Sequence, residues 1–280
     1  MPPRPARAFA YVALAYALAA GAAIAVAALV MPAGTAPWLT ALCADLAATL
    51  VVFAFSRAAN NSSVIDAYWS LSPIAIALYA ALGPHAAAGD RTRKIVAVAL
   101  VAFWGLRLTY NWARGFEGLH HEDWRYVDLR EKNPRAYWLI SLIGLHAFPS
   151  ALTFAGSLPL LFGLASSRPF GLADALAAAL TFAAALLETV ADQSLHSYRA
   201  RRARGDDDAT LDSALWRTLR YPNYIGEIGL WWGLFAIGQA AGAAPLWTGA
   251  GAAAITAMFV FISIPMKRAR LASRRNVNAG

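Results

Sequence analysis

Eight long apolar segments dominate this sequence, and they restrict the chain to a bundle of membrane-spanning helices. They cover residues 8–31, 37–55, 64–82, 95–113, 137–163, 170–190, 223–241 and 246–266. Each is close to the length of about 20 residues that an α-helix needs to cross the hydrocarbon layer of a bilayer. Charged residues make up only 14% of the 280 residues, well below the share of about 25% in soluble domains. We therefore predict an all-α polytopic membrane protein with about eight transmembrane helices.

The basic residues are distributed unevenly between the two sides of this predicted bundle. With a cytoplasmic N-terminus, 19 of the 24 Lys and Arg residues lie on the inner side, four lie on the outer side and Arg107 lies within a span. An excess of basic residues marks the cytoplasmic side of a membrane protein. We therefore expect a bacterial inner-membrane protein with both termini in the cytoplasm. The net charge of +8 then reflects orientation and contact with anionic membrane lipid rather than with nucleic acid, and no obligate protein partner is evident.

The chain divides into an N-terminal transmembrane helix and a larger membrane domain. Residues 1–35 hold the first apolar segment, which exceeds the apolar core of about 7–15 residues found in cleaved signal peptides, so we expect this helix to be retained. Residues 36–280 hold the rest, with two polar loops at 114–136 and 192–221 on the predicted cytoplasmic side. Both loops contain aromatic residues, which favours a functional role over disorder. The single cysteine, Cys43, excludes an intramolecular disulfide, and we expect no metal site.

Ionisable side chains within a bilayer are costly, so each one in an apolar segment indicates a function unless a simpler reason is at hand. Seven residues need such a reason: Asp45, Asp66, Arg107, His146, Asp174, Glu188 and Glu227. Asp174 lies in the first turn of its predicted helix, where a carboxylate is favourable. Asp45 and His146 have no polar neighbour at helical spacing, and we interpret them as partners in interhelical hydrogen bonds. The other four lie near the cytoplasmic ends of their helices.

Helical spacing extends each of those four residues into a polar stripe. The stripes combine Asp66 with Trp69; Trp104 with Arg107, Asn111 and Arg114; Glu188 with Asp192 and Arg199; and Asn223 with Glu227 and Trp231. Four stripes that open to one side predict a cytoplasm-facing cavity in the bundle. The alternative is that these charges only form ion pairs that fasten the helices together.

The charges of this cavity suggest what it binds. Both signs of charge, aromatic rings and an adjacent basic cluster suit an anionic ligand with phosphates and flat rings, such as a nucleotide cofactor. The cluster contains Arg199, Arg201, Arg202, Arg204, Arg217 and Arg220. The same cluster could instead hold anionic lipid headgroups, and charge alone does not separate the two.

Four motifs in order give the chain a family resemblance. Residues 215–227 read LWRTLRYPNYIGE and are followed by WWG at 231–233. This stretch resembles the C-terminal signature of the membrane steroid 5-alpha-reductase superfamily, and more closely its bacterial DUF1295 branch. The other motifs are NSSVIDAYW at 61–69, WGLRL at 104–108 and EDWRY at 122–126. The similarity covers roughly residue 60 to the C-terminus.

The resemblance implies a seven-helix core that holds NADPH on the cytoplasmic side and reduces a carbon–carbon double bond conjugated to a ketone in a lipophilic, steroid-like substrate. By position in the motifs, the residues that would contact the cofactor are Arg107, Arg125, Asp192, His196, Arg199, Arg220, Asn223, Tyr224 and Glu227. The acid side of the reaction would fall to Asp66 with a neighbouring tyrosine. Tyr68 is about 200° around the helix from Asp66, so we favour Tyr110, on the helix that carries Arg107.

Two departures from the family pattern bear on the substrate and the acid. Ile65 and Asp66 stand where the eukaryotic steroid reductases have a Gln–Glu pair, and Trp104 stands where they have a tyrosine. Tyr221 replaces the histidine of the Arg-His-Pro-Asn-Tyr motif. The main alternative is a membrane methyltransferase of the isoprenylcysteine or phospholipid type, which shares the C-terminal helix pair and would bind S-adenosylmethionine. A scaffold or transporter without enzymatic activity is the third possibility.

Overall fold

A computed structural model describes residues 5–206, 208–211 and 214–277, and every regular element in these ranges is helical. The α-helices are α1 (Pro5–Ala25), α2 (Pro37–Ala58), α3 (Tyr68–Leu82), α4 (Arg91–Gly115), α5 (Trp124–Lys132), α6 (Tyr137–Ile140), α7 (Phe148–Gly163), α8 (Leu172–Ala203), α9 (Ala214–Thr218), α10 (Pro222–Ala240), α11 (Ala250–Met258) and α12 (Ile264–Val277). Short 3-10 segments are η2 (Ser62–Ile65), η3 (Pro84–Ala86) and η5 (Leu246–Gly249), and π-helical segments are η1 (Val26–Val30), η4 (Ser141–Ala147) and η6 (Phe259–Ser263). The predicted all-α fold is confirmed.

Seven helical segments of the described chain are long and apolar enough to cross a membrane, so the protein is a polytopic membrane protein. They are Ala6–Val30, Pro37–Ala58, Ser62–Leu82, Arg91–Gly115, Tyr137–Gly163, Leu172–Ala203 and Leu246–Arg270. Seven of the eight predicted spans correspond to these segments. The eighth, predicted at 223–241, is the helix α10, which is not among the seven. Its sequence includes Glu227 and Gln239, and it packs on α8, α7 and α11.

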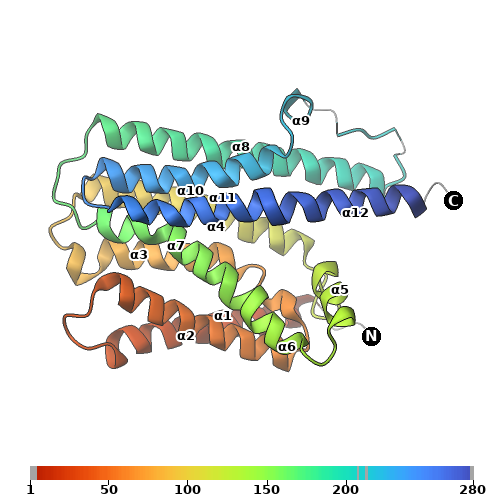
Figure 1. Ribbon diagram of the computed structural model, residues 1–280, viewed down its shortest axis with the longest axis horizontal. Helices are drawn as coiled ribbons and strands as arrows, with labels where there is room; N and C mark the ends of the chain where they lie inside the picture. The colour runs from red at the N-terminus through yellow and green to blue at the C-terminus, as the bar shows by residue number, and fades with distance from the viewer. Residues whose placement is uncertain (1–4, 207, 212–213, 278–280) are drawn as a thin grey trace.

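The polar loops and the chain ends gather at one end of the bundle. Figure 1 shows α5, α9, the start of α1 and the end of α12 at the right-hand end, and the connections α1–α2, α3–α4 and α7–α8 at the left-hand end. In the same view α8, α10 and the last span lie side by side, and α1 and α2 form a hairpin along the opposite edge. The two long loops that the sequence placed on one side do share that side.

Small residues allow the helices to approach closely. A Cβ atom on Gly251 of α11 would lie 2.2 Å from the backbone of Ala155 in α7, and one on Gly105 of α4 would lie 2.3 Å from the carbonyl oxygen of Ser70 in α3. Membrane helices lack a hydrophobic driving force between them and depend on such close packing. The Gly105 contact fixes α4 against α3, and so helps to set the direction in which Arg107 points.

His146 and Asp174, two of the remaining ionisable residues within the predicted spans, have hydrogen-bond partners of the kinds predicted. His146 lies with Nε2 2.9 Å from the Ser56 hydroxyl and Nδ1 2.9 Å from the Ser141 carbonyl oxygen. Asp174 accepts the Gly171 N–H at the start of α8 over 2.9 Å. It also forms a buried ion pair of 2.6 Å with Arg93, a partner that the sequence did not reveal. The ion pair of Asp174 with Arg93 joins α8 to α4, and His146 joins η4 to α2.

Candidate functional site

Two of the predicted polar stripes meet face to face between α4 and α8. Arg107 lies with Nη2 2.6 Å from Glu188 Oε2 and donates from Nη1 to Asp192 Oδ2 over 2.7 Å. Asn111, one turn further along α4, donates to the same Asp192 oxygen over 3.2 Å. The side chains of Arg107 and Glu188 are only 9% and 5% exposed. A buried cation and a buried carboxylate, with the partly exposed carboxylate of Asp192 beside them, therefore meet where α4 and α8 approach the polar end of the bundle.

Glu227, the carboxylate in the predicted stripe on α10, has a different role. Glu227 accepts the indole N–H of Trp104 through Oε2 over 2.8 Å and that of Trp231 through Oε1 over 2.9 Å. The two indole rings pack edge to face, with centroids 5.2 Å apart. Both oxygens of Glu227, which the family resemblance places at the cofactor, thus have indole partners: Oε2 joins α10 to α4, and Oε1 contacts Trp231 one turn along α10 itself.

Loss of this carboxylate should cost stability. Glu227→Ala leaves two buried indole N–H groups without an acceptor, at about 1–3 kcal/mol each, and we expect a clear fall in the thermal unfolding midpoint in detergent. Glu227→Gln keeps one acceptor and should fall less. Thr256→Val is the matched control, because Thr256 accepts from the exposed indole of Trp232 over 3.1 Å and water can replace it. Equal midpoints for Glu227→Ala and Thr256→Val would contradict this role.

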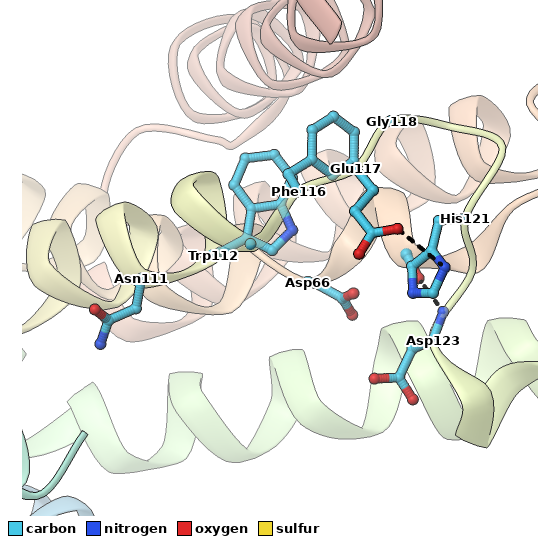
Figure 2. A pocket seen from close by; sticks show the side chains of 10 residues that line it. Asp66, Asn111, Trp112, Phe116, Glu117, Gly118, His121 and Asp123 are labelled. Carbon is cyan, nitrogen blue, oxygen red and sulfur yellow. Dashed lines mark hydrogen bonds and ion pairs between the residues drawn. The ribbon is translucent and has the colours of Figure 1, made fainter. Parts of the chain in front are cut away.

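A pocket of about 240 Å³ lies beside this network, at the start of α3. It is lined by Ser63, Asp66, Asn111, Trp112, Gly115, Phe116, Glu117, Gly118, His121 and Asp123. Figure 2 shows Asp66 between the aromatic side chains on one side and Asp123 on the other. Because Asn111 lines this pocket and also contacts Asp192, the pocket and the buried ion network share a wall.

The hydroxyl group that reaches Asp66 belongs to Tyr126 of α5. Tyr126 donates to Asp66 Oδ1 over 2.7 Å, and its side chain is buried. Burial, and then the nearby Asp66 carboxylate, raise the pKa of the Tyr126 hydroxyl well above its ordinary range. The hydroxyl therefore keeps its proton at physiological pH and acts as a donor.

The sequence motifs NSSVIDAYW and EDWRY build this arrangement by binding each other. Asn61 donates to the carbonyl oxygens of Leu119 and His121 over 2.9 and 2.8 Å. Glu122 accepts the backbone N–H of Ser62 over 2.6 Å, and the backbone N–H of Asp123 donates to the Ser63 hydroxyl over 2.9 Å. Asp123 then caps α5 through the Arg125 N–H. These hydrogen bonds form a clamp that positions α5 so that Tyr126 reaches Asp66.

The two tyrosines proposed from the sequence lie elsewhere. Tyr68 donates to Asp45 over 3.0 Å, on the side of α3 that faces α2. Tyr110 is 64% exposed, with the Arg114 guanidinium 5.5 Å from its ring, and none of its described contacts involves Asp66. The proposed pairing of Tyr110 or Tyr68 with Asp66 is therefore wrong in this structure. Tyr126 stands in a quoted motif, but its reach to Asp66 depends on the fold of the loop, which helical spacing does not predict.

The motif at the start of α10 forms an aromatic corner. Tyr221 has a left-handed backbone with φ of 58°, directly before Pro222, which opens the helix. Its ring stacks on Tyr224 at 5.6 Å with an angle of 16°. The ammonium group of Lys267 lies 5.1 Å from each of these rings and 6.0 Å from Trp216. Lys267 thus belongs to this corner, although the sequence analysis assigned it no role in the site.

Further predicted residues gather around the same corner. Tyr224 interacts electrostatically with Arg125, Arg199 and Asp192. Two polar atoms of this corner are buried and have no hydrogen-bond partner in the described part of the chain, Asn223 Oδ1 and Trp216 Nε1. By contrast, His196 and Arg220 are exposed, and the described contacts do not connect them to the site.

One family model and one curated protein match the chain. The sequence profile of the family described as "Protein of unknown function (DUF1295)" matches residues 52–279. The chain is also similar to a protein of Schizosaccharomyces pombe called "Uncharacterized protein C594.04c", with 26% identity over 238 residues, which cover 76% of this chain and 68% of that protein. No solved structure matches the chain.

Proposed function

The chain belongs to the DUF1295 family, and we propose that it is a membrane-embedded reductase that uses NADPH to saturate a carbon–carbon double bond conjugated to a ketone in a lipophilic, steroid-like molecule. The proposal extends the family assignment to the steroid 5-alpha-reductase superfamily, whose motifs the chain resembles. The observation that carries it is the network of Arg107, Glu188 and Asp192, which adjoins a pocket lined by Asp66, the residue that accepts the Tyr126 hydroxyl. A purely structural ion pair would not require such a pocket beside it.

The residues at the polar end fit a dinucleotide. An acceptor on Asn223 and a donor on Trp216 are buried there without a hydrogen-bond partner among the described residues, and buried polar groups are costly unless they find a partner. Arg125, Arg199 and Lys267 supply positive charge close to Tyr224. Guanidinium groups bind phosphate oxygens through paired hydrogen bonds, so these residues would hold the phosphates. NADPH, when bound, supplies the hydride.

The acid side of the reaction is assigned to Tyr126 and Asp66. Reduction of an enone leaves negative charge on the ketone oxygen, and a preorganised donor lowers the barrier by a few kcal/mol. The Tyr126 hydroxyl is buried and protonated, and its one proton is donated to Asp66 in the structure. With substrate bound, this hydroxyl would turn its proton from Asp66 to the ketone oxygen. Trp112 and Phe116 supply apolar walls to the same pocket, as a lipophilic substrate needs.

The cellular setting follows from the charge distribution. We place the protein in the bacterial inner membrane with both termini and the pocket on the cytoplasmic side, where basic residues are in excess and NADPH is available. The substrate would partition into the membrane itself. No nucleic acid or obligate protein partner is needed for this activity.

Cofactor binding tests the proposal. Purified protein in detergent should bind NADPH, and Asn223→Ala should weaken that binding at least tenfold while the unfolding midpoint stays unchanged, because Asn223 Oδ1 has no partner within the described chain. NADPH should also bind more tightly than NADH, since arginines meet the 2′-phosphate. Gln239→Ala, at the far end of α10, is the control for a polar change in the same helix.

The same measurement separates the alternatives. Binding of S-adenosylmethionine in place of NADPH would identify a methyltransferase. If the protein binds neither ligand, the reductase proposal fails and the non-enzymatic alternative is favoured. A panel of lipophilic enones, incubated with membranes and NADPH, would then identify the substrate class.

A further inference from the structure

Asp45, in the middle of α2, has one satisfied and one unsatisfied oxygen. The residue is 6% exposed within the 22-residue span Pro37–Ala58. Its Oδ1 atom accepts hydrogen bonds from the hydroxyl groups of Tyr68, over 3.0 Å, and Ser72, over 2.5 Å. Its Oδ2 atom has no hydrogen-bond partner among the described residues. The sequence-based interpretation of Asp45 as an interhelical hydrogen-bond partner therefore explains Oδ1 but not Oδ2.

The surroundings of Asp45 are polar but uncharged. Thr49, one turn along α2, donates to the hydroxyl of Ser150 in α7 over 3.0 Å. Three hydroxyl-bearing helices, α2, α3 and α7, therefore meet at this depth. Hydroxyl groups can donate hydrogen bonds to a carboxylate, but they do not neutralise its charge.

Titratable and charged groups on the elements packed against α2 are committed to other partners. Tyr11 and Tyr16 of α1 donate to the backbone carbonyls of Phe55 and Val64. His146 of η4 is held by Ser56 and Ser141. Asp66, which follows η2, accepts from Tyr126, and Arg57, at the end of α2, lies over the ring of Trp138. No described contact brings a basic side chain to Asp45.

We propose that Asp45 is an intramembrane proton-binding site, held as a neutral carboxylic acid with its proton on Oδ2. An isolated carboxylate inside a bilayer is very costly, and uptake of a proton removes the charge. The observed contacts match this form, because the carbonyl oxygen of an acid accepts two hydrogen bonds, as Oδ1 does from Tyr68 and Ser72. The site is separate from the Asp66 pocket and does not depend on the proposed reduction.

Infrared spectroscopy of the full chain in lipid vesicles tests this directly. With aspartate labelled by carbon-13, the wild-type protein should show the carbonyl band of a protonated carboxyl group at neutral pH, shifted in heavy water. Asp45→Asn should remove the contribution of Asp45 to that band. Asp174→Asn is the matched control, since Asp174 is equally buried but paired with Arg93 at 2.6 Å, and it should leave the band unchanged.

A second variant keeps the carboxyl group in place. Ser72→Ala removes one hydrogen bond to Oδ1 and should move the Asp45 band to higher frequency, because the carbonyl bond strengthens when it accepts less. A band whose intensity is unchanged in Asp45→Asn, or that does not move in Ser72→Ala, would overturn the assignment. So would a band that appears only after sodium is removed, which would identify a sodium-bound carboxylate instead.

Discussion

Arg107→Leu is expected to abolish NADPH binding and to lower the free energy of unfolding by about 3–5 kcal/mol, the cost of leaving a buried partner charge uncompensated. The side chain of Glu188 is 5% exposed and lies 2.6 Å from Arg107, so water cannot replace the guanidinium. Thermal unfolding in detergent measures the loss of stability, and equilibrium titration with NADPH measures the loss of binding. Arg114→Leu is the control, because Arg114 joins the same two helices through an exposed contact with Gln193, and exposed contacts contribute about 1 kcal/mol or less.

A double variant separates the role of this network in cofactor binding from a purely structural role in joining α4 to α8. Replacing both Arg107 and Glu188 by leucine removes both buried charges, and such exchanges are often neutral or stabilising. We expect Arg107→Leu with Glu188→Leu to recover most of the stability while NADPH binding stays lost. If the double variant regains both stability and binding, the network only fastens α4 to α8.

Tyr126→Phe is expected to lower turnover of an accepted enone by about 100- to 1,000-fold, the usual effect of losing one preorganised donor to a developing oxyanion. Asp66→Asn should have a smaller effect, because an amide oxygen can still accept from the Tyr126 hydroxyl. The affinity for NADPH should stay unchanged in both variants, which separates the acid from the cofactor site. Tyr110→Phe, at an exposed position, is the control.

The pH dependence of turnover offers an independent check on the same residue. Burial and Asp66 raise the pKa of Tyr126, so the donor form is fully present at neutral pH and is lost only as the pH rises beyond the ordinary tyrosine value of about 10. Turnover with saturating NADPH should therefore not decline as the pH rises from 7 to about 9. Full activity of Tyr126→Phe would place the acid on another residue.

The sequence alone determined the membrane class, the approximate limits of the spans and the common side of the polar loops. These features depend on hydropathy along one dimension and on helical period, both of which are local. The same period paired Arg107 with Asn111 on α4, and Glu188 with Asp192 on α8. Since each helix must turn its polar stripe away from lipid, the sequence predicted that these stripes face the interior of the bundle, but it did not predict which two would meet.

The tertiary structure decided which side chains complete each site. Tyr126 reaches Asp66 only because Asn61 and Glu122 clamp the loop before α5, and a loop path is not encoded in a periodic pattern. Glu227 accepts from Trp231 because of helical spacing within α10, but its contact with Trp104 of α4 depends on how the two helices are placed in the bundle. Asp45 keeps one oxygen without a described partner for the same kind of reason: which faces of α2, α3 and α7 meet is set by the packing of the whole bundle, and no single helix specifies it.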